Sequence, residues 1–463
     1  MLSFTASGPK LCDGIARREF LRVGGLSAFG LSAGIAASAA NAAVSSTAKA
    51  KRCIVLFLMG GPPQHSTWDP KPDNAAEIRG AYGPISTSVP GIQISELLPK
   101  TATLMHHVAL LRGVSTGDNA HSSSGYAMLT GRPHQPLNFE NANPGPPNNW
   151  PTIGAVVQHL QTGKYVLPPA VRLPQFIFNT DRSVWPGQDA GFLGSTADPW
   201  LFEGEPASPT FQIPEFQLRA DQTLQRLDFR KALLNQLDAK LGQIEDSEQL
   251  ATYSEKNQQA FRVLRQATQD NAFDLAREPG KIREAYGMNQ FGQSVLLARR
   301  LIESDVKFVQ VNWFRASTEP DDAPSWDSHA RETLRLRTVL CPPFDSAFSA
   351  LLSDLVDRRL LDETLVVCMA EFGRSPKMNA NGGRDHWGNA FSIALAGGGI
   401  QGGAVHGSTD RQGGAVASGL VRPNDITATI FDRLGYHPTT QIRDHLNRPF
   451  PISDGHAIRQ ILS

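Results

Sequence analysis

The sequence predicts an α/β protein, an αβα sandwich with a mostly parallel central sheet. Five short apolar runs predict strands, and their apolarity is continuous, which is typical of strands covered on both faces. Amphipathic stretches lie between the runs, and this alternation favours a layered fold. The predicted strands are Cys53–Met59, Val108–Leu111, Phe308–Val311, Leu365–Met369 and Phe391–Leu395. The predicted helices are Ser95–His107, Thr152–Gln161, Asn289–Glu303 and Phe344–Arg359. We expect Ile54–Leu58 and Leu365–Val367 to be central strands.

Composition narrows the class of protein. The chain has 463 residues, with 44 basic and 44 acidic side chains and a formal net charge of +0. A neutral chain gives no electrostatic reason to expect nucleic acid or an anionic membrane surface as a partner. A hydrophobic content of 40% is enough for a large core and excludes a disordered chain. The 4 cysteines lack CxxC or CxxH spacing, which excludes a disulfide framework and a zinc-ribbon site.

Residues 1–43 are predicted to be a cleavable twin-arginine export signal. Arg17 and Arg18 stand directly before Glu19-Phe20-Leu21, and a small-residue, mildly apolar stretch follows up to Ala40. An N-terminal helix of the fold is the alternative. Export by this pathway predicts a protein that folds before it reaches the periplasm or cell envelope. No later segment holds 18 consecutive apolar residues, so we expect no stable membrane insertion.

The mature chain, residues 44–463, is predicted to form a single domain. A polar segment at about 218–274, rich in Leu, Gln, Lys and Glu, predicts a helical insertion between sheet strands. Residues 138–150 form a loop rich in Pro and Asn.

Residues able to carry chemistry follow four of the predicted strands. Because sites in parallel sheets form at the carboxyl ends of strands, we predict that these residues share one site. An Asp and a His two positions apart suit a divalent ion such as Zn²⁺ or Mn²⁺. Taken singly, each residue also fits a structural role. The candidates are His65 and Asp69, then His121, then Asp327 and His329, then Glu371, Arg374, Asp385 and His386.

Two of these candidates have alternatives that the residues leave open. His121 stands at a probable start of a helix, where backbone amides favour a bound anion. The serines that follow it, Ser122 to Ser124, are helix caps or reactive hydroxyls. Glu371 ends a buried strand, so its charge is costly unless it is paired or metal-bound. Arg374 pairs with Glu371 or binds an anionic group of a substrate.

Four segments together resemble the family named domain of unknown function 1501. They are FLMGGPPQHSTWDPKP, HSSSGYAMLTGRPH, WDSHA and AEFGRSPKMNANGGRDHWGNAFSIALAGGG, and the resemblance runs from about Cys53 to the C-terminus. That family is similar to the alkaline phosphatase and sulfatase superfamily, whose fold is an αβα sandwich with a two-metal site at strand ends. The resemblance implies a divalent metal cofactor (Zn, Mn or Ca) and a sulfated or phosphorylated small molecule or glycan as substrate.

The resemblance also implies roles for individual residues. The LTGR of Leu129–Arg132 looks like the end of the sulfatase nucleophile motif, which places the nucleophile position on His121. The superfamily has Cys, Ser or Thr there, so the chain departs from the pattern, and Ser122 and Ser124 are the candidate replacements. Asp327, His329 and His386 resemble one intact metal site. A second site would be rebuilt from the remaining candidates, which are His65, Asp69, His121, Glu371 and Asp385.

Two functions follow from these observations. The first is an exported metal-dependent hydrolase of a sulfate or phosphate ester, with His121 and Arg374 as catalytic residues and metal-activated water as the attacking group. The second is a non-catalytic exported binding or assembly module that keeps the sulfatase-like fold. The missing nucleophile favours the module. The ionisable residues at strand ends and the export signal favour the hydrolase.

Overall fold

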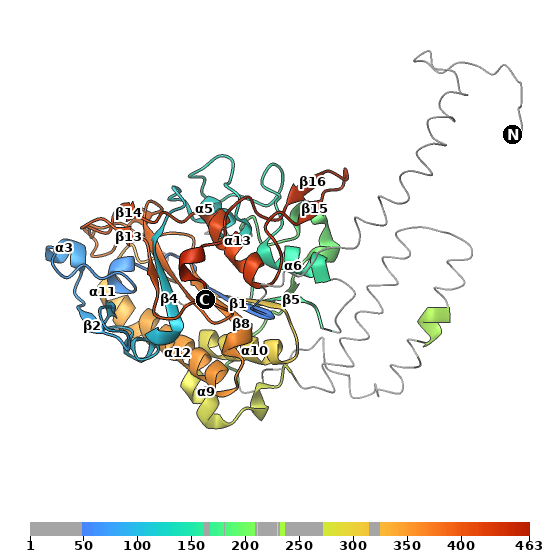
Figure 1. Ribbon diagram of the computed structural model, residues 1–463, viewed down its shortest axis with the longest axis horizontal. Helices are drawn as coiled ribbons and strands as arrows, with labels where there is room; N and C mark the ends of the chain where they lie inside the picture. The colour runs from blue at the N-terminus through green and yellow to red at the C-terminus, as the bar shows by residue number, and fades with distance from the viewer. Residues whose placement is uncertain are drawn as a thin grey trace, which may run out of the picture. The chain divides into compact units, whose positions relative to one another are not determined.

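An eight-stranded sheet runs through the middle of the protein (Figure 1). The computed structural model describes residues 49–161, 167–179, 181–208, 211, 229, 232–236, 272–313 and 325–463. In order across the sheet, the strands are β12 (Val405–His406), β4 (Val108–Val114), β11 (Phe391–Ala396), β8 (Thr364–Met369), β1 (Arg52–Phe57), β7 (Phe308–Asn312), β5 (Ala170–Leu173) and β6 (Trp200–Leu201). Only β11 runs antiparallel to its two neighbours among these strands.

The predicted strands are all present, and the mostly parallel sheet is confirmed. β1 and β8 are adjacent central strands, and Ile54 pairs with Val366 in their parallel register. On its other side β1 pairs with β7. The three strands that the apolar pattern does not predict, β5, β6 and β12, are short, and β6 and β12 have only 2 residues each.

Helices cover both faces of the sheet (Figure 1). On one face lie α9 (Gly280–Tyr286), α10 (Gln290–Glu303) and α12 (Cys341–Asp357), and on the other lie α5 (His121–Thr130), α6 (Ile153–Gln161) and α13 (Pro423–Arg433). Successive side chains of a strand point to opposite faces. On β1, Ile54 and Leu56 pack with α10 and α12, whereas Val55 and Phe57 pack with α5, α6 and α13. Both faces of β1 therefore need apolar residues, which explains its unbroken apolar run.

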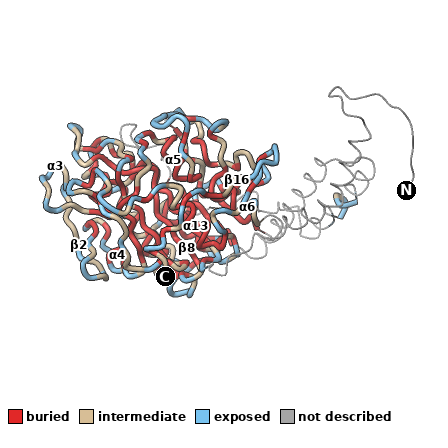
Figure 2. The backbone as a smooth tube through the Cα atoms, turned by 45° about the horizontal axis from the view of Figure 1, so that its top comes forward, coloured by how far each residue is buried: buried red, intermediate tan, exposed pale blue. Residues whose placement is uncertain are grey.

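Burial follows the same layering. Figure 2 shows the buried backbone around β8 and α13, whereas α3 (Ala76–Arg79) lies at the exposed periphery. One helical stretch of the described chain, Glu332–Asp357, is long and apolar enough to cross a membrane by length and composition alone. Much of it is α12, whose apolar residues are buried in the core beneath the sheet, and a core helix passes the same test.

Three of the four predicted helices are confirmed as α6, α10 and α12. Asn289 caps α10, because its side chain accepts a hydrogen bond from the amide of Gly292 at 2.9 Å. The predicted helix Ser95–His107 is wrong over most of its length. There the chain leaves β3 (Gln93–Ser95) and forms the short α4 (Pro99–Ala102). Pro99 lacks an amide proton and favours the first turn of a helix, so α4 begins there and not earlier.

Smaller elements decorate the sheet. They are α11 (Glu332–Arg335) and the antiparallel pairs β2 (Pro84–Ser86) with β3, β9 (Gly373–Arg374) with β10 (His386–Trp387), β13 (Ser408–Thr409) with β14 (Val416–Ser418), and β15 (Gln441–Arg443) with β16 (Pro449–Pro451). The predicted signal at residues 1–43 and most of the predicted insertion at about 218–274 lie outside the described residues.

Candidate metal centre

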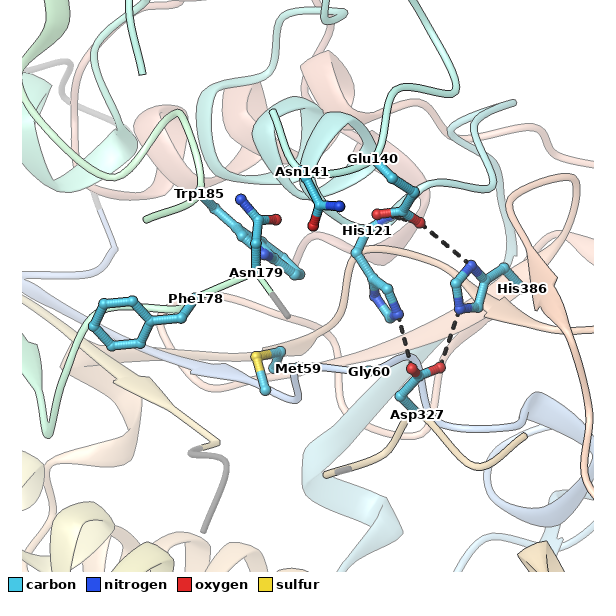
Figure 3. A pocket seen from close by; sticks show the side chains of 10 residues that line it. All are labelled: Met59, Gly60, His121, Glu140, Asn141, Phe178, Asn179, Trp185, Asp327 and His386. Carbon is cyan, nitrogen blue, oxygen red and sulfur yellow. Dashed lines mark hydrogen bonds and ion pairs between the residues drawn. The ribbon is translucent and has the colours of Figure 1, made fainter. Parts of the chain in front are cut away.

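Side chains from several strand ends meet at one edge of the sheet. β1, β4, β7 and β8 run in the same direction, so their carboxyl ends share this edge. His121 begins α5 after β4, Asp327 follows β7, and His386 lies in β10 beyond β8. One ligand atom from each of these three side chains lies within 4.8 Å of the others. Figure 3 shows both imidazoles pointing toward the carboxylate of Asp327.

The contacts within this cluster are short. Nε2 of His121 lies 3.1 Å from Oδ2 of Asp327, and Nε2 of His386 lies 3.1 Å from Oδ1 of the same carboxylate. His329 joins them, because its Nε2 lies 3.0 Å from Asp327 Oδ1 and 2.8 Å from His386 Nε2. The structure therefore brings together Asp327, His329 and His386, the three side chains that the sequence predicts to converge.

Glu371 fixes the far side of the His121 ring. It is fully buried at the end of β8, and its Oε1 accepts hydrogen bonds from Nδ1 of His121 at 2.8 Å and from the amide of Gly60 at 2.7 Å. Its Oε2 has no hydrogen-bond partner among the described residues. Gly60 is required here, because its φ is +109° and a Cβ would lie 2.3 Å from the amide nitrogen of Asp327.

Arg374 pairs with Asp327 but does not line the cavity beside the cluster. Its side chain is fully buried, pairs with Oδ1 of Asp327 and donates to the carbonyl oxygens of Gly60 and Gly61. Of the two roles left open for Arg374, pairing with Glu371 or binding an anionic group, the structure shows neither and pairs Arg374 with Asp327 instead. Gln64 holds the backbone of Arg374 in place, because its Oε1 accepts from the Arg374 amide at 2.9 Å. Arg374 is therefore placed to orient Asp327.

The charges of the cluster balance only when His121 is protonated. Asp327 and Glu371 carry two negative charges, and Arg374 supplies one positive charge. Burial opposes a charge on His121, yet Asp327 and Glu371 together raise its pKa to about 10. Burial and the neighbouring positive His121 lower the pKa of His386 to about 3. One proton, held by His121, therefore completes the cluster.

A divalent metal ion fits the same position. The donor set of two or three imidazoles and a carboxylate is one that divalent transition metals and zinc bind. Ligands at about 2.0–2.2 Å from an ion lie roughly 3–3.5 Å from one another, and the contacts around Asp327 are close to that spacing. Glu371 is not part of this donor set, because its Oε1 lies at Nδ1 of His121, whereas Nε2 of the same ring faces Asp327.

Three of the predicted site residues lie apart from this cluster or at its rim. Nε2 of the buried His65 lies 2.7 Å from the carbonyl oxygen of Gln412. Asp69 pairs with Lys71 at 3.0 Å. Asp385 is exposed at the rim, with its Oδ1 3.4 Å from Nδ1 of His329. The structure thus does not bring His65 and Asp69 to the cluster, because the chain after β1 turns into a short 3₁₀ helix whose side chains pack against residues 410–414.

The serines of α5 serve the structure around them. Ser122 donates to the carbonyl of Phe139 at 3.0 Å, Ser123 accepts from the amide of Phe139 at 3.1 Å, and Ser124 donates to the carbonyl of Glu371 at 2.6 Å. All three are fully buried. None of them lines the cavity beside the cluster.

That cavity has a volume of about 210 Å³ and opens directly beside the cluster (Figure 3). Its lining residues are Met59, Gly60, His121, Glu140, Asn141, Phe178, Asn179, Trp185, Asp327 and His386. Seven of them are absent from the sequence-based candidates. Met59 and Gly60 follow β1, and the other five, Glu140, Asn141, Phe178, Asn179 and Trp185, come from loops that follow no apolar strand pattern.

Glu140 approaches the start of α5. Its Oε1 accepts a hydrogen bond from the amide of His121 at 2.8 Å and lies 3.6 Å from Nδ1 of His386. A carboxylate at the first amide of a helix is favoured by the helix dipole. The anion-binding property expected of this helix start is therefore present, and a side chain of the same protein occupies it.

Known proteins and protein families resemble this chain to different degrees. A family model described as "Protein of unknown function (DUF1501)" matches residues 50–462. A search of curated proteins finds no match to this chain. Similar solved structures include the PsFucS1 sulfatase from Pseudoalteromonas sp., with 12% identity, a TM-score of 0.38, and coverage of 84% of this chain and 68% of that chain.

Two further solved structures have similar scores. The phosphonate monoester hydrolase SpPMH from Silicibacter pomeroyi has 14% identity, a TM-score of 0.38, and coverage of 89% of this chain and 76% of that chain. A protein in the alkaline phosphatase superfamily from Vibrio parahaemolyticus has 11% identity, a TM-score of 0.37, and coverage of 86% of this chain and 73% of that chain.

Proposed function

We propose that this chain, which belongs to the DUF1501 family, is an exported metal-dependent hydrolase of a sulfate or phosphate ester. The observation that carries the proposal is the convergence of His121, Asp327 and His386 beside a cavity, with Glu371 holding the ring of His121. The proton of His121 that faces Asp327 occupies the place that a metal ion would take. The resemblance of the surrounding motifs to the sulfatase superfamily supports the ester class.

His121, Asp327 and His386 would hold the ion, with His329 beside them. Imidazole donors favour Zn²⁺ or Mn²⁺ over Ca²⁺, because Ca²⁺ takes oxygen ligands. When bound, such an ion supplies Lewis acidity and lowers the pKa of water to about 7 in the best-known zinc sites.

The other residues of the site orient these ligands. Arg374 holds one oxygen of Asp327 in place, and Glu371 fixes the ring of His121 through Nδ1. The backbone oxygen of Asn119 lies 2.8 Å from Nδ1 of His386 and fixes that ring in the same way. Such partners of metal ligands set ring orientation and basicity. Because the hydroxyls of Ser122 to Ser124 are committed to backbone or neighbouring partners, the proposal assigns the attack on the ester to water.

A non-catalytic binding or assembly module is the second candidate. The observation that favours it is the lining of the cavity, which contains no Ser, Thr or Cys among the described residues. Superfamily-like catalysis through a covalent intermediate has no side chain to use there.

Metal content and ester hydrolysis together test the proposal. The protein would be purified as the mature chain. Bound metal would be measured by mass spectrometry, and turnover would be measured with 4-nitrophenyl sulfate and 4-nitrophenyl phosphate. We expect bound Zn or Mn, loss of that metal in His386→Ala, and no change in the exposed control His456→Ala. A His386→Ala variant that keeps its metal contradicts the site. A folded, metal-loaded wild type that hydrolyses neither ester supports the binding module.

Export is a separate part of the proposal. Arg17 and Arg18 lead the predicted signal, so replacing both with Lys should trap the precursor in the cytoplasm. Fractionation of cells that express the double variant measures this. Normal export of that variant contradicts a twin-arginine route.

A further inference from the structure

We propose that the cavity wall facing away from the metal cluster binds an uncharged ring, the organic part of the ester. The identity of the ester rests on the proposed function, but ring binding can be measured without turnover. The wall consists of Met59, Asn141, Phe178, Asn179 and Trp185, and we call it the ring subsite. Figure 3 shows it on the side of the cavity away from Asp327 and His386.

Charge selects against an anionic ring. Among the described residues that line the cavity there is no Lys or Arg, and the acidic ones are Glu140 and Asp327. Arg374 is fully buried and pairs with Asp327. The ring subsite itself has no charged side chain, so a carboxylate or sulfate on the ring, held away from His121, would have no counter-ion there. The ring subsite therefore fits a neutral group.

The aromatic part of the ring subsite is fixed relative to His121. The indole of Trp185 rests on α5 at Gly125, where a Cβ would lie 2.5 Å from the ring. The centroid of Trp185 lies 5.8 Å from that of His121. Gly125 is one helical turn from His121, so the helix sets the spacing between the aromatic wall and the metal cluster. A ring held on this wall would place its ester group at His121.

The amides add a polar edge to the ring subsite. Nδ2 of Asn179 donates to the carbonyl oxygen of Ala142 at 3.1 Å and to Oγ of Ser183 at 2.8 Å, so this amide is held in one orientation. Aromatic faces together with fixed amides suit a ring with an apolar face and hydrogen-bonding substituents. The cavity volume of about 210 Å³ is smaller than the roughly 300–1,000 Å³ of pockets for drug-sized ligands. It therefore fits one ring at a time.

Two probes of equal shape test the charge preference. 4-Hydroxybenzamide and 4-hydroxybenzoate differ in charge and little else, and their binding to the protein as purified would be measured by ligand-detected NMR. We expect the amide to bind at least about tenfold more tightly, because the benzoate has no counter-ion in the ring subsite. Methyl β-D-glucopyranoside distinguishes a sugar ring from an aryl ring. Repeating the titrations after chelation reveals any benzoate bound through a metal.

Variants locate the binding. Phe178→Ala should weaken the preferred neutral probe by about threefold or more, the scale of an aromatic contact. Gly125→Ala should weaken it by displacing Trp185, while Phe139→Ala, at a half-exposed residue outside the lining, should not. Equal or tighter binding of the benzoate after chelation overturns the proposal, and so does the absence of binding by any neutral probe. Neither result depends on whether an ester is hydrolysed, so failure of the proposed function remains distinguishable.

Discussion

Two clusters of buried charged side chains in the described part of the chain differ in what balances their carboxylates. Under the sheet, the fully buried Arg299 of α10 pairs with Glu278 at 2.7 Å and with Asp354 at 2.8 Å. Arg358 adds pairs with Asp354 at 2.7 Å and with Glu303 at 2.9 Å. With Arg300, which pairs with Glu278, this cluster holds three arginines and three carboxylates. We call it the Arg299 network.

The candidate metal centre has the opposite character. Its two carboxylates, Asp327 and Glu371, face one arginine, so a proton on His121 supplies the second positive charge. A buried network whose charges are paired by arginines holds helices together, and breaking it is costly. A buried network that is balanced by a proton can exchange that proton for a metal ion. The two clusters therefore differ in whether fixed charges or an exchangeable proton balance their carboxylates.

The largest expected effect comes from breaking the Arg299 network. Arg299→Met leaves Glu278 and Asp354 buried without their main partner, which should lower the free energy of unfolding by about 3–5 kcal/mol. Urea titration followed by circular dichroism measures this. The exposed control Arg411→Met should stay within about 0.5 kcal/mol of wild type. A stable Arg299→Met protein would remove the distinction between the clusters.

Removing a side chain from the metal centre should affect activity instead. His121→Ala is expected to reduce ester turnover by at least about 10²-fold, the scale for losing a group that acts on or positions the reacting atoms. The free energy of unfolding should fall by less than in Arg299→Met, because Arg374 still pairs with Asp327. Turnover and unfolding would be measured on the same preparation. An inactive variant that is also unfolded would make His121 a core residue.

A milder change at the centre should lower metal affinity without loss of the fold. Glu371→Gln keeps the shape of the side chain but removes the negative charge that holds Nδ1 of His121, so metal affinity should fall by about 10–100-fold, as for other partners of metal ligands. In metal-free protein this change should not destabilise the fold as Arg299→Met does. Competition with a fluorescent chelator measures the affinity, and the exposed Glu77→Gln is the control. Unchanged affinity would mean that Glu371 serves only to hold Gly60.

Acid should reveal the smallest difference. Burial raises the pKa of Glu278, but Arg299 and Arg300 outweigh it and hold the pKa below its ordinary value of 4.5. A carboxyl with a lowered folded-state pKa contributes stability above about pH 4.5, and this is lost as the pH falls through the folded pKa. The urea concentration at the midpoint of unfolding should therefore decrease as the pH is lowered below 4.5. This decrease should be less steep in Glu278→Gln. Parallel pH curves for the two proteins would contradict this linkage.

The sequence predicts the central strands of the sheet better than its edge strands. β1 and β8 are buried on both faces, so their unbroken apolar runs are visible without any structure. β6 and β12 are 2 residues long and lie at the sheet edges, where pairing rather than composition makes the strand. The segment Ser95–His107 has the amphipathic spacing of a helix, but it is not one continuous helix. The only α-helix in it, α4, begins at Pro99 and ends at Ala102.

The site is predictable only where residues follow strands. Asp327, His329 and His386 stand at strand ends and do converge. His65 also follows a strand, but the turn after β1 carries it away from the cluster. Trp185 and its neighbours in the ring subsite come from loops, whose positions depend on tertiary packing such as the contact of Trp185 with Gly125. The contact between Trp185 and Gly125 cannot be predicted from any spacing in the sequence.

The cluster is assembled from distant parts of the chain, and this ties its formation to the order of folding. His121 and Glu371 are 250 residues apart, and Asp327 and His386 are 59 apart. A fragment that lacks β4, β7 or β8 does not bring the three ligand side chains together. An ion could therefore be bound only after the long-range strand pairing is finished. Ion capture would then add RT ln(1 + [M]/Kd) to the stability of the whole sheet rather than to one loop. For a protein proposed to cross a membrane already folded, this places metal selection in the compartment where folding ends.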